Sequence, residues 1–179
     1  ISVDEYQDTS NVQFSIINEM RKAKCVKSLF IVGDDDQSIY GFRDANVELI
    51  KNFFEMIGEN GLDVQLMENR RSTHNIVDFA SILISYNQNR IEKHPKSTNE
   101  EGEPVCVSAF ASKEDEQEYI VDVIEDLIKN GRKDNEIAIL APTNAELMVY
   151  ADMLKKRGIE SVSINPEPIL ENPRVVGAV

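Results

Sequence analysis

Residues 3–9 read VDEYQDT, and residues 28–43 read SLFIVGDDDQSIYGFR. In each stretch, acidic and amide side chains come directly after a short apolar run of the kind found in buried parallel strands. Open α/β sheets bind their ligands in the crevice outside the carboxyl ends of such strands. The two stretches therefore predict an α/β fold whose polar loops gather at one edge of a parallel sheet.

Asp4 and Glu5 carry the chemistry of the first stretch. One carboxylate can hold a magnesium ion that bridges the β- and γ-phosphates of a nucleotide, usually through water because Mg²⁺ gives up its hydration shell reluctantly. The neighbouring carboxylate can orient and deprotonate an attacking water. We assign Asp4 to the metal and Glu5 to the catalytic base, with both carboxylates as candidate metal ligands. An isolated Asp-Glu pair is also typical of a solvated turn, so this interpretation depends on the whole string.

Strand-like and helix-like segments alternate through the rest of the chain. Apolar residues recur at helical spacing in residues 12–20, 47–54, 72–86, 112–129 and 143–157. Short apolar runs predict strands at residues 64–67, 105–110, 137–140 and 162–164. This alternation implies parallel sheet with covering helices.

Local signals predict where several helices begin and end. Ser10 or Asn11 is expected to cap the first helix, because side-chain oxygens there accept from orphan backbone N–H groups. Two further pairs have the spacing of a capping box, Ser112 with Asp115 and Thr143 with Glu146. Glycine is common just after a helix, as at Gly131 and Gly158.

The composition, 41% hydrophobic and 28% charged residues, is that of an ordinary globular protein that can bury a core. Neither a membrane-spanning apolar run nor a signal-peptide pattern is present in the sequence. Cys25 and Cys106 lie far apart, each in or beside an apolar segment, and we predict buried free thiols rather than a disulfide or a metal site. A reducing, cytoplasmic setting fits these features.

The net charge of −13, from 32 acidic and 19 basic residues, argues against nucleic-acid binding, which depends on cationic contacts to phosphate. That objection is weaker for a fragment of a larger protein. The chain begins at Ile1 without methionine and contains no G-x-x-x-x-G-K-[ST] phosphate-binding loop. We therefore expect a fragment whose activity requires the remainder of the same polypeptide.

Together, the two opening motifs resemble the magnesium-binding and ATP-to-DNA coupling motifs of superfamily 1 DNA helicases of the UvrD/Rep/PcrA type. The resemblance implies an ATP- and Mg²⁺-dependent 3′-to-5′ translocase that acts on single-stranded DNA and duplex junctions, with possible repair or replication proteins as partners. It also implies two RecA-like motor domains with ATP between them. Residues 1–61 would be the closing part of the first domain and residues 62–179 the opening part of the second. The seam is predicted at residues 58–61, which read GENG.

Gln37 is the residue at which the resemblance places coupling. An amide near the γ-phosphate can donate a hydrogen bond that is lost on hydrolysis, so its loop can change position with the nucleotide state. In the resembled helicases the glutamine at this place is credited with that role. The alternative is a turn amide that satisfies its own loop.

Tyr40, Phe42 and Arg43 follow in the same loop. Exposed aromatic rings beside a guanidinium suit single-stranded DNA, because every base has a face on which a ring can stack. Phe42 stands where the family usually has tryptophan, and Asp44 where glycine is common. Core packing is the alternative for Tyr40.

Residues 69–72, NRRS, resemble the family's Asn-Tyr-Arg-Ser. Arg71 matches the arginine that reaches the γ-phosphate and would act as an internal arginine finger. Arg70 replaces the tyrosine that stacks on adenine, and its guanidinium could also lie flat on a base or remain in solvent. Residues 141–146, APTNAE, resemble a segment of the second motor domain in which Asn144 would contact the DNA backbone; helix capping is its alternative.

Two other classes of protein remain open. A helicase-like scaffold without catalysis is disfavoured by the presence of Asp4, Glu5 and Gln37, together with Arg71. A nucleotide-dependent switch that binds proteins but not DNA is disfavoured by the loop that carries Tyr40 and its neighbours.

Overall fold

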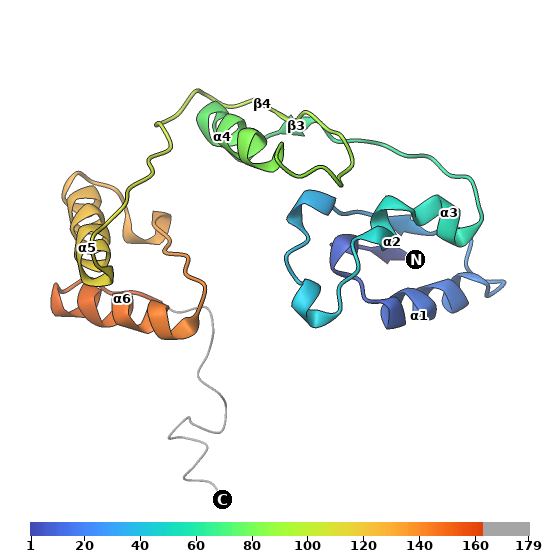
Figure 1. Cartoon of the computed structure of the whole chain (residues 1–179), viewed down its shortest axis with the longest axis horizontal. Coiled ribbons are helices and arrows are strands. Elements are labelled where there is room, and N and C mark those ends of the chain that lie inside the picture. The colour runs from blue at the N-terminus through green and yellow to red at the C-terminus, as the bar shows by residue number, and fades with distance from the viewer. Residues whose placement is uncertain (163–179) are drawn as a thin grey trace, which may run out of the picture. The chain divides into compact units, whose positions relative to one another are not determined.

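The computed structural model describes residues 1–162 of the chain. It divides into two compact units, residues 1–106 and residues 107–179 (Figure 1), and each unit is described by itself. The units are mixed α/β, with short strands paired in parallel. None of the described helices is long and apolar enough to cross a membrane.

The N-terminal half of the first unit is built on two parallel strands, β1 (Ser2–Val3) and β2 (Phe30–Ile31). Three helices pack around this pair, α1 (Asn11–Arg21), α2 (Glu48–Lys51) and α3 (Phe53–Ile57). Tyr6 and Leu49 are fully buried, and the Tyr6 ring meets that of Phe53 edge to face at 5.5 Å between centroids. This core fixes the backbone directly after Asp4 and Glu5.

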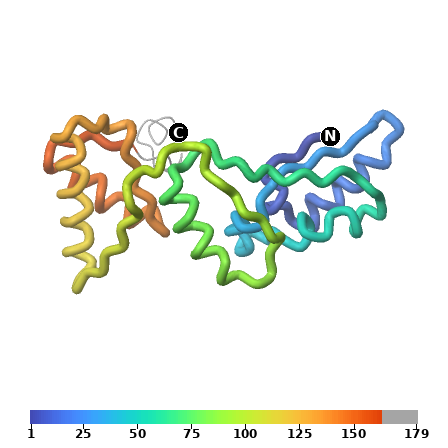
Figure 2. The backbone as a smooth tube through the Cα atoms, turned by 90° about the horizontal axis from the view of Figure 1, so that it is seen from above, coloured from blue at the N-terminus to red at the C-terminus, as the bar shows by residue number. Residues whose placement is uncertain are grey.

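The second half of the first unit holds another parallel pair, β3 (Glu68–Asn69) and β4 (Lys96–Ser97). Helix α4 (His74–Ile84) follows β3, and the chain then returns to β4 (Figure 2). Backbone bonds from His74 to Glu100 and from Asn75 to Glu101 hold the start of α4 beside the segment after β4.

The second unit is a pair of helices, α5 (Lys113–Lys129) and α6 (Asn144–Lys156). Its core consists of Val121 and Ile124 from α5 packed against Tyr150 and Leu154 from α6. Arg157, after α6, reinforces the pairing through ion pairs with three carboxylates of α5, Glu118, Asp122 and Glu125.

The predicted helix starts are confirmed. Ser10 and Gln13 form a reciprocal capping box at α1, with bonds of 2.8 and 3.3 Å. Ser112 accepts from the Asp115 N–H and Thr143 from the Glu146 N–H. The glycines after α5 and α6 lie in the left-handed region, with φ of 91° at Gly131 and 75° at Gly158, a conformation that glycine adopts without steric cost.

Three strand predictions are wrong. Residues 64–67, 105–110 and 137–140 belong to no helix or strand, and strand β3 begins only at Glu68. A strand exists only where its backbone joins a ladder with a neighbour, and the ladders among the described residues are β1–β2 and β3–β4. The Met67 carbonyl accepts one bond of 2.8 Å from the Lys96 N–H, just before β3 begins. Leu66 and Leu140 are accordingly open, at 85% and 94% exposed, whereas Ile137 and Ile139 are partly buried against the core of the second unit. The predicted strand at 162–164 lies outside the described residues from position 163 onward.

Two smaller expectations also need correction. Residues 47–54 form two short helices, α2 and α3, because Asn52 departs from helical geometry with φ −108° and ψ 24°. Cys25 and Cys106 are free but exposed rather than buried. Cys25 lies in the turn after α1, and Cys106 lies outside any helix or strand, so neither belongs to an element with a packed face.

Candidate functional site

The loops after β1 and β2 leave the same edge of their sheet. Backbone bonds of 2.9 Å run from the Tyr6 N–H to the Val32 carbonyl and from the Val32 N–H to the Val3 carbonyl. Because parallel strands end on one side, the pair Asp4 and Glu5 comes to lie beside the loop that begins at Gly33. The sequence-based prediction that the two motifs meet at one edge is therefore confirmed.

Gln7 joins the two loops. Its side-chain Nε2 donates to Glu5 Oε2 at 2.7 Å, and its Oε1 accepts from the Asp34 N–H at 3.1 Å. The residue is only 2% exposed. A glutamine amide both donates and accepts, so this one side chain can bridge a carboxylate and a backbone N–H. The sequence-based prediction did not include Gln7, although this residue belongs to the same motif as Asp4 and Glu5.

Asp34 extends this path to Gln37. The Gln37 Nε2 donates to Asp34 Oδ2 at 2.8 Å, within the turn Asp35–Gln37 that directly follows. The candidate base Glu5 and the candidate coupling residue Gln37 are thus connected through Gln7 and Asp34. The same bond also satisfies the amide locally, which was the alternative interpretation of Gln37.

Gly33 permits the close approach of the two loops. A Cβ atom at this position would lie 2.5 Å from Gln7 Oε1 and 3.0 Å from the Tyr6 backbone nitrogen. The contact with Gln7 is closer than Cβ atoms come to a neighbour, and the Tyr6 nitrogen is backbone that cannot swing away. A side chain at this position would therefore force the surrounding atoms to shift.

Asp4 and Glu5 present their carboxylates to solvent. Glu5 has φ 48° and ψ 45°, the left-handed region that a residue other than glycine adopts at a cost. Its N–H donates to Asp4 Oδ1 at 2.9 Å, and its own carboxylate is turned toward Gln7. Adjacent, accessible carboxylate oxygens are the donors that magnesium prefers, so the residues present fit that ion.

A second acidic group, Asp34, Asp35 and Asp36, brings its carboxylate oxygens within 4.8 Å of one another. Basic side chains already occupy this group, since Lys93 pairs with all three aspartates and Arg90 with Asp36. Two basic side chains thus compensate most of the charge of the three carboxylates, and we do not take the cluster as a candidate metal site.

Three of the four residues predicted to bind DNA, Tyr40, Phe42 and Arg43, lie in one loop. Arg43 places its guanidinium carbon 5.2 Å from the Tyr40 ring centroid and 5.5 Å from that of Phe42. Phe42 is 78% exposed and Tyr40 38% exposed, which does not match core packing. The next residue, Asp44, has φ 63°, the left-handed conformation in which glycine is favoured. The loop therefore offers open aromatic faces beside a cation.

Arg70 and Arg71 lie directly after β3, at the start of the loop into α4. Arg70 pairs with Glu68 at 2.6 Å and is exposed, as is Arg71. The Asn69 carboxamide shapes this loop by accepting from the N–H groups of Arg71 and Ser72. Among the described residues, neither arginine makes a direct contact with Glu5 or Gln37, so the arginine-finger role stays a prediction.

Asn144 is the first residue of α6, in the second unit, and its side chain is exposed. Helix capping is performed by the preceding residue, Thr143, whose hydroxyl accepts from Glu146. Thr143 is therefore the residue that caps the helix. DNA contact by Asn144 stays a prediction.

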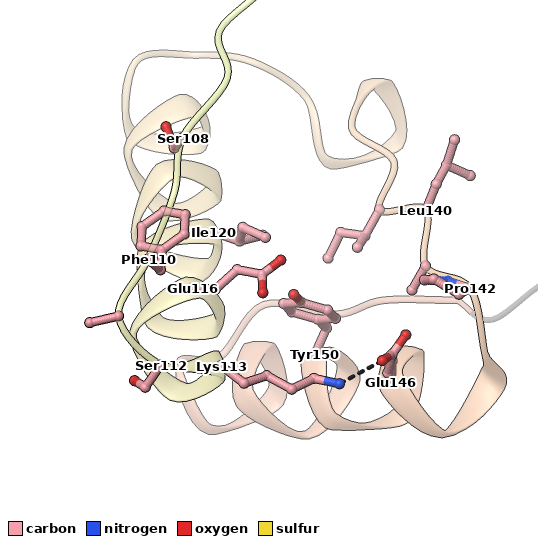
Figure 3. A pocket seen from close by; sticks show the side chains of 13 residues that line it. Ser108, Phe110, Ser112, Lys113, Glu116, Ile120, Leu140, Pro142, Glu146 and Tyr150 are labelled. Atoms are coloured by element: carbon pink, nitrogen blue, oxygen red, sulfur yellow. Dashed lines mark hydrogen bonds and ion pairs between the residues drawn. The ribbon is translucent and has the colours of Figure 1, made fainter.

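The second unit also contains a pocket of about 600 Å³, none of whose lining residues is a predicted site residue. Tyr150 and Glu116 point into it, and Lys113 and Glu146 form an ion pair at its margin (Figure 3). That ion pair lowers the pKa of Glu146 and raises the pKa of Lys113. Because Lys113 is already paired, the pocket has no free cation for a phosphate, and we assign it no catalytic role.

Comparison with known families identifies the class of protein that this site defines. The model of the UvrD/REP helicase N-terminal domain matches residues 1–57, and that of the UvrD-like helicase C-terminal domain matches residues 64–171. The chain belongs to the UvrD-like helicase family. The predicted domain boundary after Gly61 remains a prediction.

Individual relatives agree with this family. The chain is 34% identical over 175 residues to the ATP-dependent DNA helicase PcrA of Staphylococcus epidermidis, which covers 98% of this chain and 24% of the relative. It is 38% identical over 154 residues to DNA helicase II of Escherichia coli K12, covering 86% of this chain and 21% of the relative. The chain thus spans about a quarter of the length of the curated relatives that it matches.

Proposed function

We propose that the chain is part of an ATP-dependent DNA helicase that couples hydrolysis to 3′-to-5′ movement on single-stranded DNA. The observation that carries this proposal is the hydrogen-bonded path from Glu5 through Gln7 and Asp34 to Gln37. It joins a candidate catalytic carboxylate to the loop that presents aromatic rings to solvent. A path of this kind is what coupling between nucleotide and DNA requires, because both sites must bias one element.

The roles at the nucleotide end follow from the chemistry of the side chains. Asp4 would hold the magnesium ion, which neutralises phosphate charge when bound. Glu5 accepts a proton from water, and the Gln7 amide fixes the orientation of its carboxylate. Arg71 would stabilise charge on the transferred phosphoryl group, and Arg70 would lie against the adenine.

The roles of the residues that would bind DNA follow from the exposure of their side chains to solvent. The open rings of Phe42 and Tyr40 would stack with bases, and Arg43 beside them would add a cation near the phosphates. Asn144 would contact the DNA backbone from the second unit. The proposed substrate is single-stranded DNA next to duplex junctions, in the cytoplasm, with repair or replication proteins as further partners.

The experiment that tests the proposal uses the full-length protein with Glu5→Gln. Glutamine keeps the shape of the side chain but removes the base, so ATP hydrolysis should fall at least about a hundredfold while ATP binding persists. Steady-state hydrolysis with and without single-stranded DNA, beside an ATP titration, measures both quantities. Glu19→Gln, an exposed glutamate of α1, is the matched control. Loss of ATP affinity with unchanged turnover per bound ATP would refute the role of Glu5.

A further inference from the structure

Arg90 and Lys93 hold the turn that contains the three aspartates. Arg90 donates two parallel hydrogen bonds to Asp36. One runs from Nε to Oδ1 at 2.9 Å and the other from Nη2 to Oδ2 at 2.6 Å. Lys93 lies 2.7 Å from an Asp34 oxygen, 3.0 Å from an Asp36 oxygen and in contact with Asp35. We refer to these two basic and three acidic side chains as the clasp.

The clasp is largely shielded from water. The side chains of Arg90 and Asp36 are 15% and 11% exposed, and that of Asp35 is 3% exposed. Asp35 also accepts from the Ile91 N–H at 2.7 Å, so each carboxylate of the turn has a defined donor. Charge-assisted, two-pronged bonds in such surroundings are strong and geometrically specific. Removing one partner leaves the other charge without compensation.

The position of the clasp distinguishes it from an ordinary ion-pair cluster. Asp34, which Lys93 grips, also accepts from Gln37 and donates its N–H to Gln7. Asp34 therefore belongs both to the clasp and to the hydrogen-bonded path from Glu5 to Gln37. The aspartates lie in the range matched by the N-terminal family model, residues 1–57, and Arg90 and Lys93 in the C-terminal range, residues 64–171.

Adjacent contacts strengthen the same junction. The Asn89 side chain donates to Glu48 at 3.3 Å and accepts from Lys51, both of helix α2. The segment 89–93 thus docks on two separate elements that follow β2, the aspartate turn and α2. Because segment 89–93 contacts both elements, its orientation relative to them is fixed. A single ion pair would leave it free to rotate.

We propose that Arg90 and Lys93 are positioning residues that hold the aspartate turn, and through Asp34 set the place of Gln37. This inference rests on the proposed coupling role of Gln37. In this arrangement, a shift of Gln37 with nucleotide state pulls on the segment 89–93, and a shift of that segment moves Gln37. The clasp is then a mechanical link between the two ranges that the family models match.

The first measurement is hydrogen exchange of residues 33–43 in the full-length protein without ligands. Arg90→Gln should speed exchange in this segment at least about tenfold, because the buried Asp36 charge loses its partner and the turn opens locally. Lys96→Gln removes an exposed lysine a few residues away and should leave exchange unchanged. Equal exchange in wild type and Arg90→Gln would overturn the proposal.

The second measurement is stimulation of ATP hydrolysis by single-stranded DNA. Arg90→Gln should lower the stimulation factor at least about fivefold, as expected for loss of a typical coupling free energy, and Lys96→Gln should not. The double variant Asp36→Arg with Arg90→Asp restores opposite charges and should recover part of the loss. Faster exchange with undiminished stimulation would overturn the coupling role of the clasp. Absence of DNA stimulation in the wild type would instead refute the proposed function, while the exchange result still decides whether Arg90 holds the turn.

Discussion

The buried Gln7 amide donates a 2.7 Å hydrogen bond to the exposed carboxylate of Glu5. Through its oxygen the same amide accepts from Asp34, so one side chain sets the positions of a catalytic candidate and of the neighbouring loop. The arrangement makes catalysis sensitive to a residue that needs no contact with nucleotide.

Gln7→Ala is expected to impair both stability and turnover in the full-length protein. It leaves the Asp34 N–H without its buried acceptor, which costs about 1–3 kcal/mol, and it frees the Glu5 carboxylate from its orienting donor. Thermal unfolding and basal ATP hydrolysis measure the two effects. Gln65→Ala, at an exposed glutamine outside any helix or strand, is the control. Unchanged hydrolysis in a folded Gln7→Ala protein would show that catalysis does not depend on orientation of the Glu5 carboxylate by the Gln7 amide.

Gly33→Ala is expected to destabilise the first unit by about 1–3 kcal/mol, the usual cost of overpacking. Its new methyl group meets both the Gln7 oxygen and the Tyr6 backbone. Gly41→Ala is the matched control, because a Cβ at Gly41 meets no atom within 4 Å. Unfolding midpoints of both variants in the full-length protein test the difference. Similar unfolding midpoints for Gly33→Ala and Gly41→Ala would mean that the atoms around Gly33 can move apart without loss of stability.

Stability near the clasp should depend on pH. Hydrogen bonds from Arg90 lower the pKa of Asp36 against the opposing effect of burial. For Asp34, burial acts to raise the pKa, but the bonds from Lys93 and Gln37 together outweigh it, and the pKa is lowered. A carboxyl whose pKa is lower in the folded state contributes stability above its unfolded pKa and loses it as the pH falls through the folded value.

The clasp should therefore be complete at neutral pH and weaken as the pH falls below about 4, the ordinary aspartate value. Hydrogen exchange of residues 33–43 in the full-length protein, measured over this range and corrected for the intrinsic pH effect, follows the loss. Arg90→Gln should flatten the dependence because it removes the main cause of the Asp36 shift. If exchange in Arg90→Gln depended on pH in the same way as in the wild type, the pH dependence would not come from the bond between Arg90 and Asp36.

Local features of the fold were predictable from the sequence. The caps at Ser10, Ser112 and Thr143 depend on residues three positions apart, and such signals act regardless of the rest of the chain. Strands were less predictable, because the runs at 64–67 and 137–140 need a distant neighbour to form a ladder. Apolar character alone indicates that a segment can pair and does not indicate with what.

The site was predictable in its residue types and less so in its connections. Asp4 and Glu5 were predicted as carboxylates at the end of an apolar run, and Gln37 from the resemblance of its motif; their roles stay predictions. The clasp joins positions more than fifty residues apart, and Arg90 and Lys93 lie between the predicted helix at 72–86 and the predicted strand at 105–110, where the sequence predicted no element. Gln7 was hidden because burial, rather than residue type, gives its amide a bridging role.

The aromatic loop and Gln37 should separate in their effects on the full-length protein. Phe42 is 78% exposed, so Phe42→Ala should weaken single-stranded DNA binding by about 1–3 kcal/mol, the loss of one stacked base. Hydrolysis without DNA should remain near the wild-type rate, since Phe42 makes no contact with Glu5 or Gln7 among the described residues. Tyr86→Ala, at another exposed ring, is the control and should leave DNA affinity unchanged.

Gln37→Ala should give the converse result. It removes the donor to Asp34 and leaves the rings of Tyr40 and Phe42 in place, so DNA affinity should be kept. Stimulation of hydrolysis by DNA should be lost, because the residue between the nucleotide and the aromatic loop is gone. ATP hydrolysis against single-strand concentration, together with a thermal melt of each variant, measures the separation. Identical profiles for Phe42→Ala and Gln37→Ala would mean that Gln37 is a turn amide and that coupling runs elsewhere.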